Sequence, residues 1–186
     1  RSLLLGVEFA FESSETLVIS LPSGLRAFHV DPKDDAVIEY AVVPPSPGQR
    51  AAPGREALGD KLVGVLGAGS MGSKVAASLA RAGVGNFLLI DDDVLGPENI
   101  ARHELDWLSV GAHKVDALAE RLKLLRPGAT VDTRRLSLGG QESSGSLHGA
   151  LAALAKCDLI VDASGSDAGF NYAASVAAES ERPMVW

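Results

Sequence analysis

The fold is decided by residues 62–72, which read LVGVLGAGSMG. A short apolar run, typical of a buried strand, leads into a G-x-G-x-x-G pattern formed by Gly67, Gly69 and Gly72. The first glycine of such a pattern permits a tight turn, the second lets the backbone approach a phosphate, and the third lets helix and strand pack closely. The helix that follows offers its N-terminal N–H groups to an anion. These residues predict a nucleotide site in a strand–loop–helix unit.

Strand-like and helix-like segments alternate from Lys61 onward. This alternation predicts an α/β fold with a Rossmann-like, mainly parallel sheet and helices on both faces. Because the sequence stops within the apolar run 183–186, we expect this domain to be incomplete at its C-terminal end. We expect strands at 62–66, 87–90, 130–136, 158–161 and 184–186, and helices at 70–82, 114–125, 147–155 and 173–178.

Residues 1–43 differ in character from the rest of the chain. Short strand-like runs alternate with turn-forming residues, so we expect a small antiparallel β meander. Residues 44–60 are rich in proline and glycine, and proline blocks the continuation of helix and sheet alike. We therefore expect a linker there, followed by a nucleotide-binding domain at 61–186. The expected strands of the meander are 3–11, 16–20, 25–30 and 36–43.

The composition excludes several classes of protein. Of 186 residues, 46% are hydrophobic and 22% are charged, a balance typical of a folded domain with a core. The net charge of -7 argues against non-specific nucleic-acid binding, which requires lysine and arginine. No run of about 18 apolar residues occurs, so we expect no membrane span. The single cysteine excludes an internal disulfide, and we expect a cytoplasmic protein.

Polar residues after the second expected strand favour ATP over a dinucleotide. Asp91 ends that strand about 20 residues beyond the glycine pattern, where a carboxylate accepts hydrogen bonds from a ribose. This feature suits NAD and ATP equally. Asn99, Arg102 and Lys114 follow, and an amide, a guanidinium and an ammonium together suit a triphosphate. A dehydrogenase does not need such a set, so we interpret the nucleotide as ATP.

These residues resemble the signature of the ThiF/MoeB/HesA family, the adenylating domain shared with ubiquitin-activating enzymes. That signature combines the glycine loop with Asp-x-Asp, Asn-x-x-Arg-Gln and Gly-x-x-Lys elements in this order. The resemblance covers about two-thirds of the chain, from Lys61 to Trp186, and His103 stands where the family has glutamine. The matching segments are Asp91-Asp92-Asp93, Asn99-Ile100-Ala101-Arg102-His103 and Gly111-Ala112-His113-Lys114.

The resemblance implies an activity. Members of the family use ATP and magnesium to adenylate the C-terminal glycine of a ubiquitin-like or sulfur-carrier protein, and they release pyrophosphate. In this chain Asp91 would hold the ribose, with Asp93 beside it in the nucleotide site. Asn99, Arg102 and Lys114 would contact the phosphates, with Arg102 and Lys114 as catalytic residues. The family also implies a homodimer or pseudo-dimer, and residues 1–43 could end a preceding module, as in bacterial fusions of conjugation and activation domains.

The family pattern is broken at the magnesium site. Relatives have Asp-x-Thr-Asp-Asn after the fourth strand, whereas residues 162–167 read DASGSD, so Gly165 replaces the second aspartate. Magnesium often takes only one or two carboxylates. We expect Asp162 to bind it and to be catalytic, because Asp162 ends a strand that points at the ligand crevice, with Asp167 as the second candidate. Loss of the metal would leave a catalytically inactive binding or dimerisation module.

The glycine pattern and Asp91 also fit an NAD(P)-dependent oxidoreductase, which stays open as a second function. We interpret Cys157 as a small buried hydrophobe rather than a nucleophile, and the four histidines lack zinc-ligand spacing. Arg50 and Arg55 are interpreted as solvated linker charges, although an upstream arginine in the family reaches the ATP of the partner subunit. Trp107 and Leu108 are expected to pack as a hydrophobic plug.

Overall fold

The computed structural model describes residues 3–4, 7–8, 12–43 and 54–186. The chain forms two compact units, Arg1–Gln49 and Arg50–Trp186. Most of the expected linker, residues 44–53, lies outside the described residues. Its last part contains the short 3-10 helix η1 (Arg55–Leu58). Within the described residues, no helix has both the length and the apolar character that crossing a membrane requires.

The first unit contains the expected antiparallel meander. Phe28 and Val30 are buried among the described residues of this unit, and Arg26 donates two hydrogen bonds of 2.8 and 2.9 Å to Glu39 on the neighbouring strand. Pairing of opposite charges across strands supports the register. The strands, in sheet order, are β3 (Glu15–Leu21), β4 (Gly24–Asp31) and β5 (Ala36–Tyr40).

The expected strand over residues 3–11 is wrong as one continuous element. Instead, β1 (Leu3–Leu4) and β2 (Val7–Glu8) pair antiparallel with each other. A single strand cannot pair with itself in this way, so the apolar run is divided into two short elements. Residues 9–11 of the expected strand lie outside the described residues.

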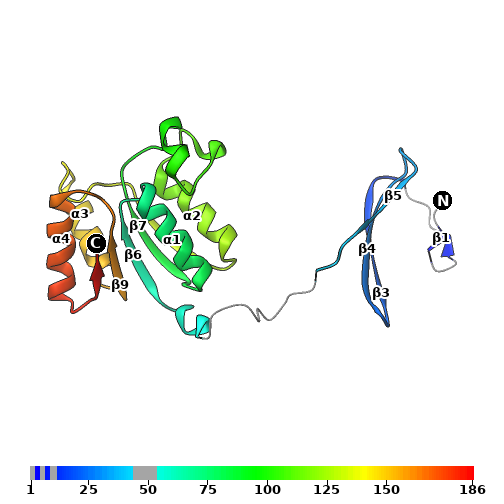
Figure 1. Ribbon diagram of the computed structural model, residues 1–186, viewed down its shortest axis with the longest axis horizontal. Helices are drawn as coiled ribbons and strands as arrows, with labels where there is room; N and C mark the ends of the chain where they lie inside the picture. Colours follow the sequence, from blue (N-terminus) through cyan, green and yellow to red (C-terminus); the bar gives the residue numbers. More distant parts are fainter. Residues whose placement is uncertain (1–2, 5–6, 9–11, 44–53) are drawn as a thin grey trace. The chain divides into compact units, whose positions relative to one another are not determined.

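The second unit is built on a five-stranded parallel sheet in the order β10-β9-β6-β7-β8 (Figure 1). The chain moves outward from β6 through β7 to β8 and then continues on the other side of β6 with β9 and β10. The strand order therefore reverses between β6 and β9, and ligands of such sheets bind beyond the carboxyl ends of the strands at this point. The strands are β6 (Leu62–Leu66), β7 (Asn86–Ile90), β8 (Thr130–Arg134), β9 (Leu159–Asp162) and β10 (Met184–Val185).

Two pairs of helices cover the two faces of this sheet, as Figure 1 shows. Side chains alternate between faces along each strand, so the buried residues divide into two separate clusters. One cluster lies under α1 and α2, and the other under α3 and α4. This arrangement confirms the predicted Rossmann-like α/β class. The helices are α1 (Ser70–Ala82), α2 (Lys114–Leu125), α3 (Ser144–Leu154) and α4 (Asp167–Glu179).

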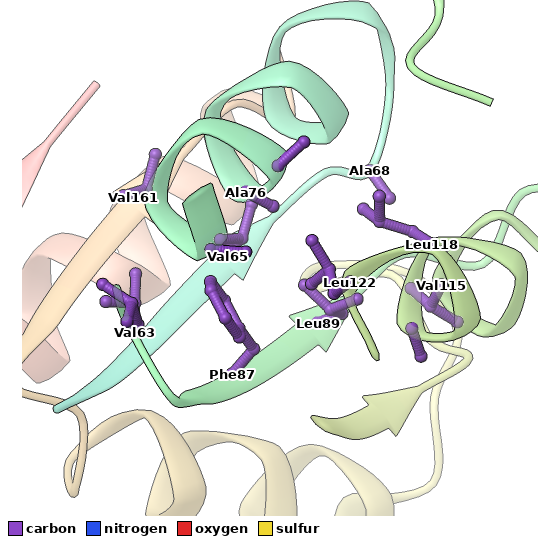
Figure 2. Packing of buried hydrophobic residues seen from close by; sticks show 14 residues of the cluster. Val63, Val65, Ala68, Ala76, Phe87, Leu89, Val115, Leu118, Leu122 and Val161 are labelled. Atoms are coloured by element: carbon purple, nitrogen blue, oxygen red, sulfur yellow. The ribbon is translucent and has the colours of Figure 1, made fainter. Parts of the chain in front are cut away.

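The core under α1 and α2 packs both helices against the sheet (Figure 2). Small alanines of α1 let its backbone approach the strands, whereas α2 contributes larger branched side chains. Burial of each large side chain stabilises the fold by roughly 1.5–3 kcal/mol. The residues labelled in this core are Val63, Val65, Ala68, Ala76, Phe87, Leu89, Val115, Leu118, Leu122 and Val161.

Cys157 belongs to the core on the opposite face. Its side chain is fully buried, and a Cβ added at Gly64 would lie 2.9 Å from its Sγ. Burial raises the pKa of the Cys157 thiol to about 11, so the thiol stays protonated and unreactive at neutral pH. The interpretation of Cys157 as a small buried hydrophobe is therefore confirmed.

Both helices on this face begin earlier than expected. α3 begins at Ser144 and α4 at Asp167, ahead of the expected residues 147 and 173. In each case the hydroxyl of a preceding serine accepts a hydrogen bond from a backbone N–H of the first turn. The capping serines are Ser143 for α3 and Ser166 for α4.

Two expectations about packing are corrected. β8 ends at Arg134 rather than at residue 136, because Leu136 leaves the strand and is buried in the second core. The expected hydrophobic plug is also absent: Trp107 is 67% exposed and Leu108 is 96% exposed. Both lie in the 3-10 helix η3 (Trp107–Ser109), which Asp106 caps by accepting a hydrogen bond from the Leu108 N–H.

Candidate functional site

The glycine loop joins β6 to α1 at the carboxyl edge of the sheet. Gly67 has φ +80, and a Cβ there would lie 2.6 Å from the Ala163 carbonyl oxygen. A Cβ at Gly72 would lie 1.8 Å from the Gly67 carbonyl oxygen, so α1 crosses the loop at backbone contact. Apart from its chain neighbours, no heavy atom of the described residues lies within 4 Å of a Cβ at Gly69. Gly67 and Gly72 therefore serve the turn and the packing, and Gly69 leaves backbone open to a ligand.

Asp91 shapes this loop from the end of β7. Its Oδ2 accepts the Ala68 N–H at 2.6 Å, and its Oδ1 accepts the Asp93 N–H at 2.7 Å. Burial raises the pKa of the Asp91 carboxyl, and the two N–H donors oppose that rise. Each oxygen has a second lone pair, so a hydroxyl can still be accepted. Asp91 thus orders the backbone of the loop and turns a carboxylate toward the same edge of the sheet.

Lys114 is held at the first residue of α2. It is only 7% exposed, and its Nζ donates to Asp93 Oδ2 at 2.6 Å. The Lys114 N–H also donates to the Asp93 carbonyl at 2.9 Å, so backbone and side chain both fix this pair. A buried ammonium requires a partner anion, and the partner carboxylate is 64% exposed. The structure therefore brings a fixed positive charge to the acidic segment after β7.

Asn99 and Arg102 lie in the 3-10 helix η2 (Pro97–Arg102) between β7 and α2. Asn99 Oδ1 accepts the Gly96 N–H at 3.0 Å and so caps the start of η2. The Arg102 carbonyl accepts the Ser70 hydroxyl at 2.8 Å, which ties the end of η2 to the first residue of α1. The Arg102 side chain is exposed and forms no ion pair within the described part of the chain. Its guanidinium is thus available to an added anion.

His103 has a structural function that sequence reasoning missed. Its Nε2 lies 2.7 Å from the Ala68 carbonyl oxygen in the glycine loop, and its Nδ1 accepts the Leu105 N–H at 3.1 Å. The ring is partly buried. Its place directly after Arg102 in the family signature was the available signal, but the contact with Ala68 is not encoded locally.

The turn after β9 contains the residues expected to bind magnesium. Asp162 is nearly buried, and its Oδ1 accepts both the Ser164 N–H at 3.0 Å and the Ser164 hydroxyl at 2.6 Å. Gly165 has φ +66, a left-handed conformation that favours glycine, and its Cβ direction is open. Asp167 is exposed at the start of α4. The turn therefore offers one buried and one exposed carboxylate.

Two cavities adjoin the loop and this turn. One of about 110 Å³ lies at the carboxyl ends of β6 and β7, and one of about 550 Å³ lies beside α1 and α4. Neither has Arg102 or Lys114 among the described residues of its wall, but Asp93, the partner of Lys114, lines the first. The first is lined by Leu66, Gly67, Ile90, Asp91, Asp92, Asp93, Leu136, Ser137, Leu138, Ser164, Ser166 and Gly169. The second is lined by Met71, Asp162, Ala163, Gly165, Ser166, Asp167, Phe170 and Trp186.

Three consecutive carboxylates gather beside the first cavity. Oxygens of Asp91, Asp92 and Asp93 lie within 4.8 Å of one another. Two of the three are already engaged, Asp91 by backbone N–H groups and Asp93 by Lys114. Asp91 and Asp93 therefore help to hold the loop in place. Asp92 is exposed and is the least constrained of the three.

Arg55 is not simply a solvated linker charge. Its Nε is buried, and its side chain lies against Gly83, which caps the C-terminal end of α1. The glycine loop lies at the opposite, N-terminal end of α1. Within this chain Arg55 therefore lies away from the nucleotide loop. Arg50 lies outside the described residues.

The comparison with known families agrees with this geometry. A sequence model of the ThiF family matches residues 48–186, which is most of the chain. The chain belongs to the ThiF family. The match includes the glycine loop, the acidic segment after β7, η2, and the start of α2.

Relatives from bacteria are similar to this chain over part of their length. The ATP-dependent ubiquitin transferase-like protein Cap2 of Pseudomonas aeruginosa is 33% identical over 128 residues, 64% of this chain and 21% of that protein. The molybdopterin-synthase adenylyltransferase of Escherichia coli is 32% identical over 110 residues, 59% of this chain and 41% of that enzyme. The chain thus spans about a fifth of the Cap2 relative.

Solved structures share the fold of this chain. The crystal structure of the E. coli tRNA N6-threonylcarbamoyladenosine dehydratase TcdA in complex with ATP has a TM-score of 0.62 and 23% identity. The match covers 74% of this chain and 54% of that one. At this identity the likeness concerns the fold, which confirms the predicted architecture.

Proposed function

We propose that this chain carries the ATP site of an enzyme that adenylates the C-terminal glycine of a ubiquitin-like or sulfur-carrier protein. The single observation that carries the proposal is that the glycine loop and Lys114 both attach to the acidic segment after β7. The Ala68 N–H of the loop donates to Asp91, and the buried Lys114 ammonium donates to Asp93. Membership of the ThiF family supports the reaction class, and the Cap2 and adenylyltransferase relatives support a protein substrate.

ATP would lie across the carboxyl edge of the sheet. The nucleoside would occupy the cavity of about 110 Å³, whose wall combines apolar Ile90 and Leu136 with Asp91. Asp91 would accept a ribose hydroxyl through a free lone pair. The phosphates would lie over Gly69, where the N-terminus of α1 offers N–H groups and the positive end of its dipole. This placement leaves the larger cavity beside α4 for the protein substrate.

The reaction is attack of a carboxylate oxygen on the α-phosphorus. The new oxygen–phosphorus bond forms as the bond from the α-phosphorus to the bridging oxygen breaks, and pyrophosphate leaves with the electron pair. The substrate carboxylate is already ionised at neutral pH and needs no base. Arg102 and Lys114 stabilise the charge on the departing pyrophosphate, and Asn99 supports η2, which carries Arg102.

The magnesium hypothesis concerns the turn after β9. Asp162 Oδ1 is occupied by Ser164, whereas Oδ2 forms no hydrogen bond within the described residues, and the carboxyl borders the larger cavity. One carboxylate and phosphate oxygens suffice for magnesium, so Asp162 fits, with the exposed Asp167 as the second candidate. Magnesium bound there would neutralise charge on the phosphates. Gly165 cannot contribute a ligand from a side chain, which is the argument for an inactive module.

Pyrophosphate exchange into ATP tests the proposal in the full-length protein with its carrier substrate. We expect Arg102→Ala to reduce exchange by about 100-fold or more, because it removes a charge used in the transition state. Its exposed side chain holds no ion pair within the described residues, so the fold should survive. Lys114→Ala should reduce exchange similarly but also destabilise the domain, because it removes a buried side chain that packs at the start of α2.

Lys123→Ala is a matched control for these variants. Lys123 is an exposed cation near the end of α2 that pairs only with Glu120 among the described residues, so exchange should be unchanged. Normal exchange in both Arg102→Ala and Lys114→Ala would refute their assigned roles. Binding of NADH without binding of ATP would instead favour the oxidoreductase, and ATP binding without exchange in the wild type would favour the inactive module.

A further inference from the structure

The ring of His103 bridges two backbone groups that belong to different parts of the site. Because Nδ1 accepts the Leu105 N–H, the proton of the neutral ring is on Nε2, which donates to the Ala68 carbonyl. Ala68 lies in the glycine loop, between Gly67 and Gly69. Leu105 is buried just after η2. Each ring nitrogen of His103 is thus used, and only the neutral ring with this tautomer satisfies both contacts.

Two further hydrogen bonds fasten the same segment to α1. The Ser70 hydroxyl donates to the Arg102 carbonyl at 2.8 Å, and the Glu104 N–H donates to Ser73 Oγ at 3.3 Å. Glu104 also pairs with Arg81 of α1 at 2.7 Å. The backbone of residues 102–105 is therefore attached to α1 and its loop at several points. Of the hydrogen bonds among the described residues, that of His103 with Ala68 attaches it to the loop backbone itself.

We propose that His103 is a positioning residue for nucleotide binding, whose neutral imidazole holds the Arg102 segment against the glycine loop and releases it on protonation. This inference rests on the proposed function, because it assigns the phosphates of ATP to the space between Gly69 and Arg102. Protonation places an N–H on Nδ1, opposite the Leu105 N–H. Two donors cannot share that contact, so the ring must move and the Arg102 segment loses its attachment to the glycine loop, while its hydrogen bonds to Ser70 and Ser73 remain.

The surroundings of the ring favour its neutral form. Burial lowers the pKa of His103 from 6.5, and the positive charges of Lys114 and Lys74 lower it further. The hydrogen bond to Ala68 and the negative charge of Asp91 oppose this shift. The intact bridge is therefore present above about pH 6.5 and is lost as pH falls through the lowered pKa. The free energy of unfolding also decreases as pH falls through this range, because the unfolded chain binds the proton at a higher pH than the folded chain does.

The test compares ATP affinity of the full chain with that of His103→Gln between about pH 8 and about pH 5. The amide of glutamine can donate to Ala68 as Nε2 does, but it does not titrate. Near pH 8 we expect the two affinities to agree within about threefold, and in acid we expect wild-type affinity to fall about five- to tenfold further than that of the variant. Titration of the ATP phosphates changes the affinity of both proteins equally, so it cancels when their pH profiles are compared. His148→Gln, which changes an exposed histidine on α3, should follow the wild type.

The outcomes separate this inference from the proposed function. Parallel pH profiles, with ATP bound at pH 8, would overturn the inference alone. A relative rise of wild-type affinity in acid would also overturn it, because it would indicate direct attraction between the imidazolium and phosphate. Failure of the wild type to bind ATP at any pH would overturn the proposed function and this inference with it.

A nitrogen-detected NMR spectrum of wild-type His103 tests the bridge without ATP. We expect a neutral ring protonated on Nε2 at pH 7 and slow exchange of the Leu105 amide, with faster exchange once the ring is protonated. A ring protonated on Nδ1, or an amide whose protection does not follow the titration, would refute the bridge even if the variants fold poorly.

Discussion

The two loops at the switch point of the sheet differ in how they are held. The glycine loop after β6 is fixed from outside itself, by Asp91 from β7 and His103 from beyond η2. The turn after β9 is fixed mainly from within, since the hydrogen bonds of Asp162 go to Ser164 two residues away. The first loop depends on two distant segments for its shape, whereas the side-chain hydrogen bonds of the second stay within the turn.

The glycine loop is therefore the preorganised part of the site, and the turn after β9 is the part that can change. A loop held by several elements places backbone N–H groups at fixed positions, which is what binding of a phosphate requires. A turn that carries its own hydrogen bonds and an open Gly165 can change residue types without disturbing the sheet. Gly165, where the resemblance predicts a departure from the family pattern, lies in the second kind of loop.

Gly72→Ala should have the largest effect on stability. The new Cβ would overlap the Gly67 carbonyl oxygen, and both partners are backbone that cannot yield without moving α1. We expect a loss of about 3 kcal/mol or more in the free energy of unfolding. Gly69→Ala is the matched control, since its Cβ meets open space and should cost under about 1 kcal/mol while weakening ATP binding. Chemical denaturation measures both, and equal losses would refute the division of roles between these glycines.

Asp162→Asn should have the next largest effect, on activity rather than on folding. Asparagine keeps an oxygen for the Ser164 donors but removes the charge proposed for magnesium. We expect exchange of pyrophosphate to fall about 100-fold and its dependence on magnesium concentration to shift upward. Asp167→Asn, an exposed neighbour on α4, should change exchange by less than about threefold. A reversal of the two results would assign the metal to Asp167.

Gly165→Asp should have the smallest effect. The Cβ direction is open, and aspartate tolerates the left-handed backbone better than most residues, so we expect a loss of about 1 kcal/mol at most. Thermal unfolding of the variant beside the wild type measures this cost. A loss comparable to that of Gly72→Ala would show that the turn after β9 is as constrained as the glycine loop, and the contrast between the two loops would fail.

The sequence predicted what is encoded locally. The glycine pattern, the apolar strands and the spacing to Asp91 correctly place the glycine loop at the carboxyl edge of the sheet. The start of α2 at Lys114 was also predicted. The sequence analysis places the start of α4 too late because Gly169 weakens the helical pattern, although Ser166 is a recognisable N-cap and Asp167 an acidic residue in the first turn. The missing signal there was capping chemistry rather than apolar periodicity.

Contacts between distant segments could not be predicted in the same way. The position of His103 beside Ala68 depends on how η2 crosses the start of α1, which no pattern within residues 97–105 specifies. The exposure of Trp107 and Leu108 likewise depends on the space around η3 rather than on their own hydrophobicity. Burial and pairing of this kind emerge only when the elements are assembled.

A crystal structure of the full-length protein with bound ATP would test the nucleotide assignment most directly. We expect the phosphates over Gly69, with the Arg102 guanidinium and the Lys114 ammonium within hydrogen-bonding distance of phosphate oxygens and the ribose beside Asp91. ATP bound elsewhere, or bound with both cations turned away from its phosphates, would contradict the proposed site.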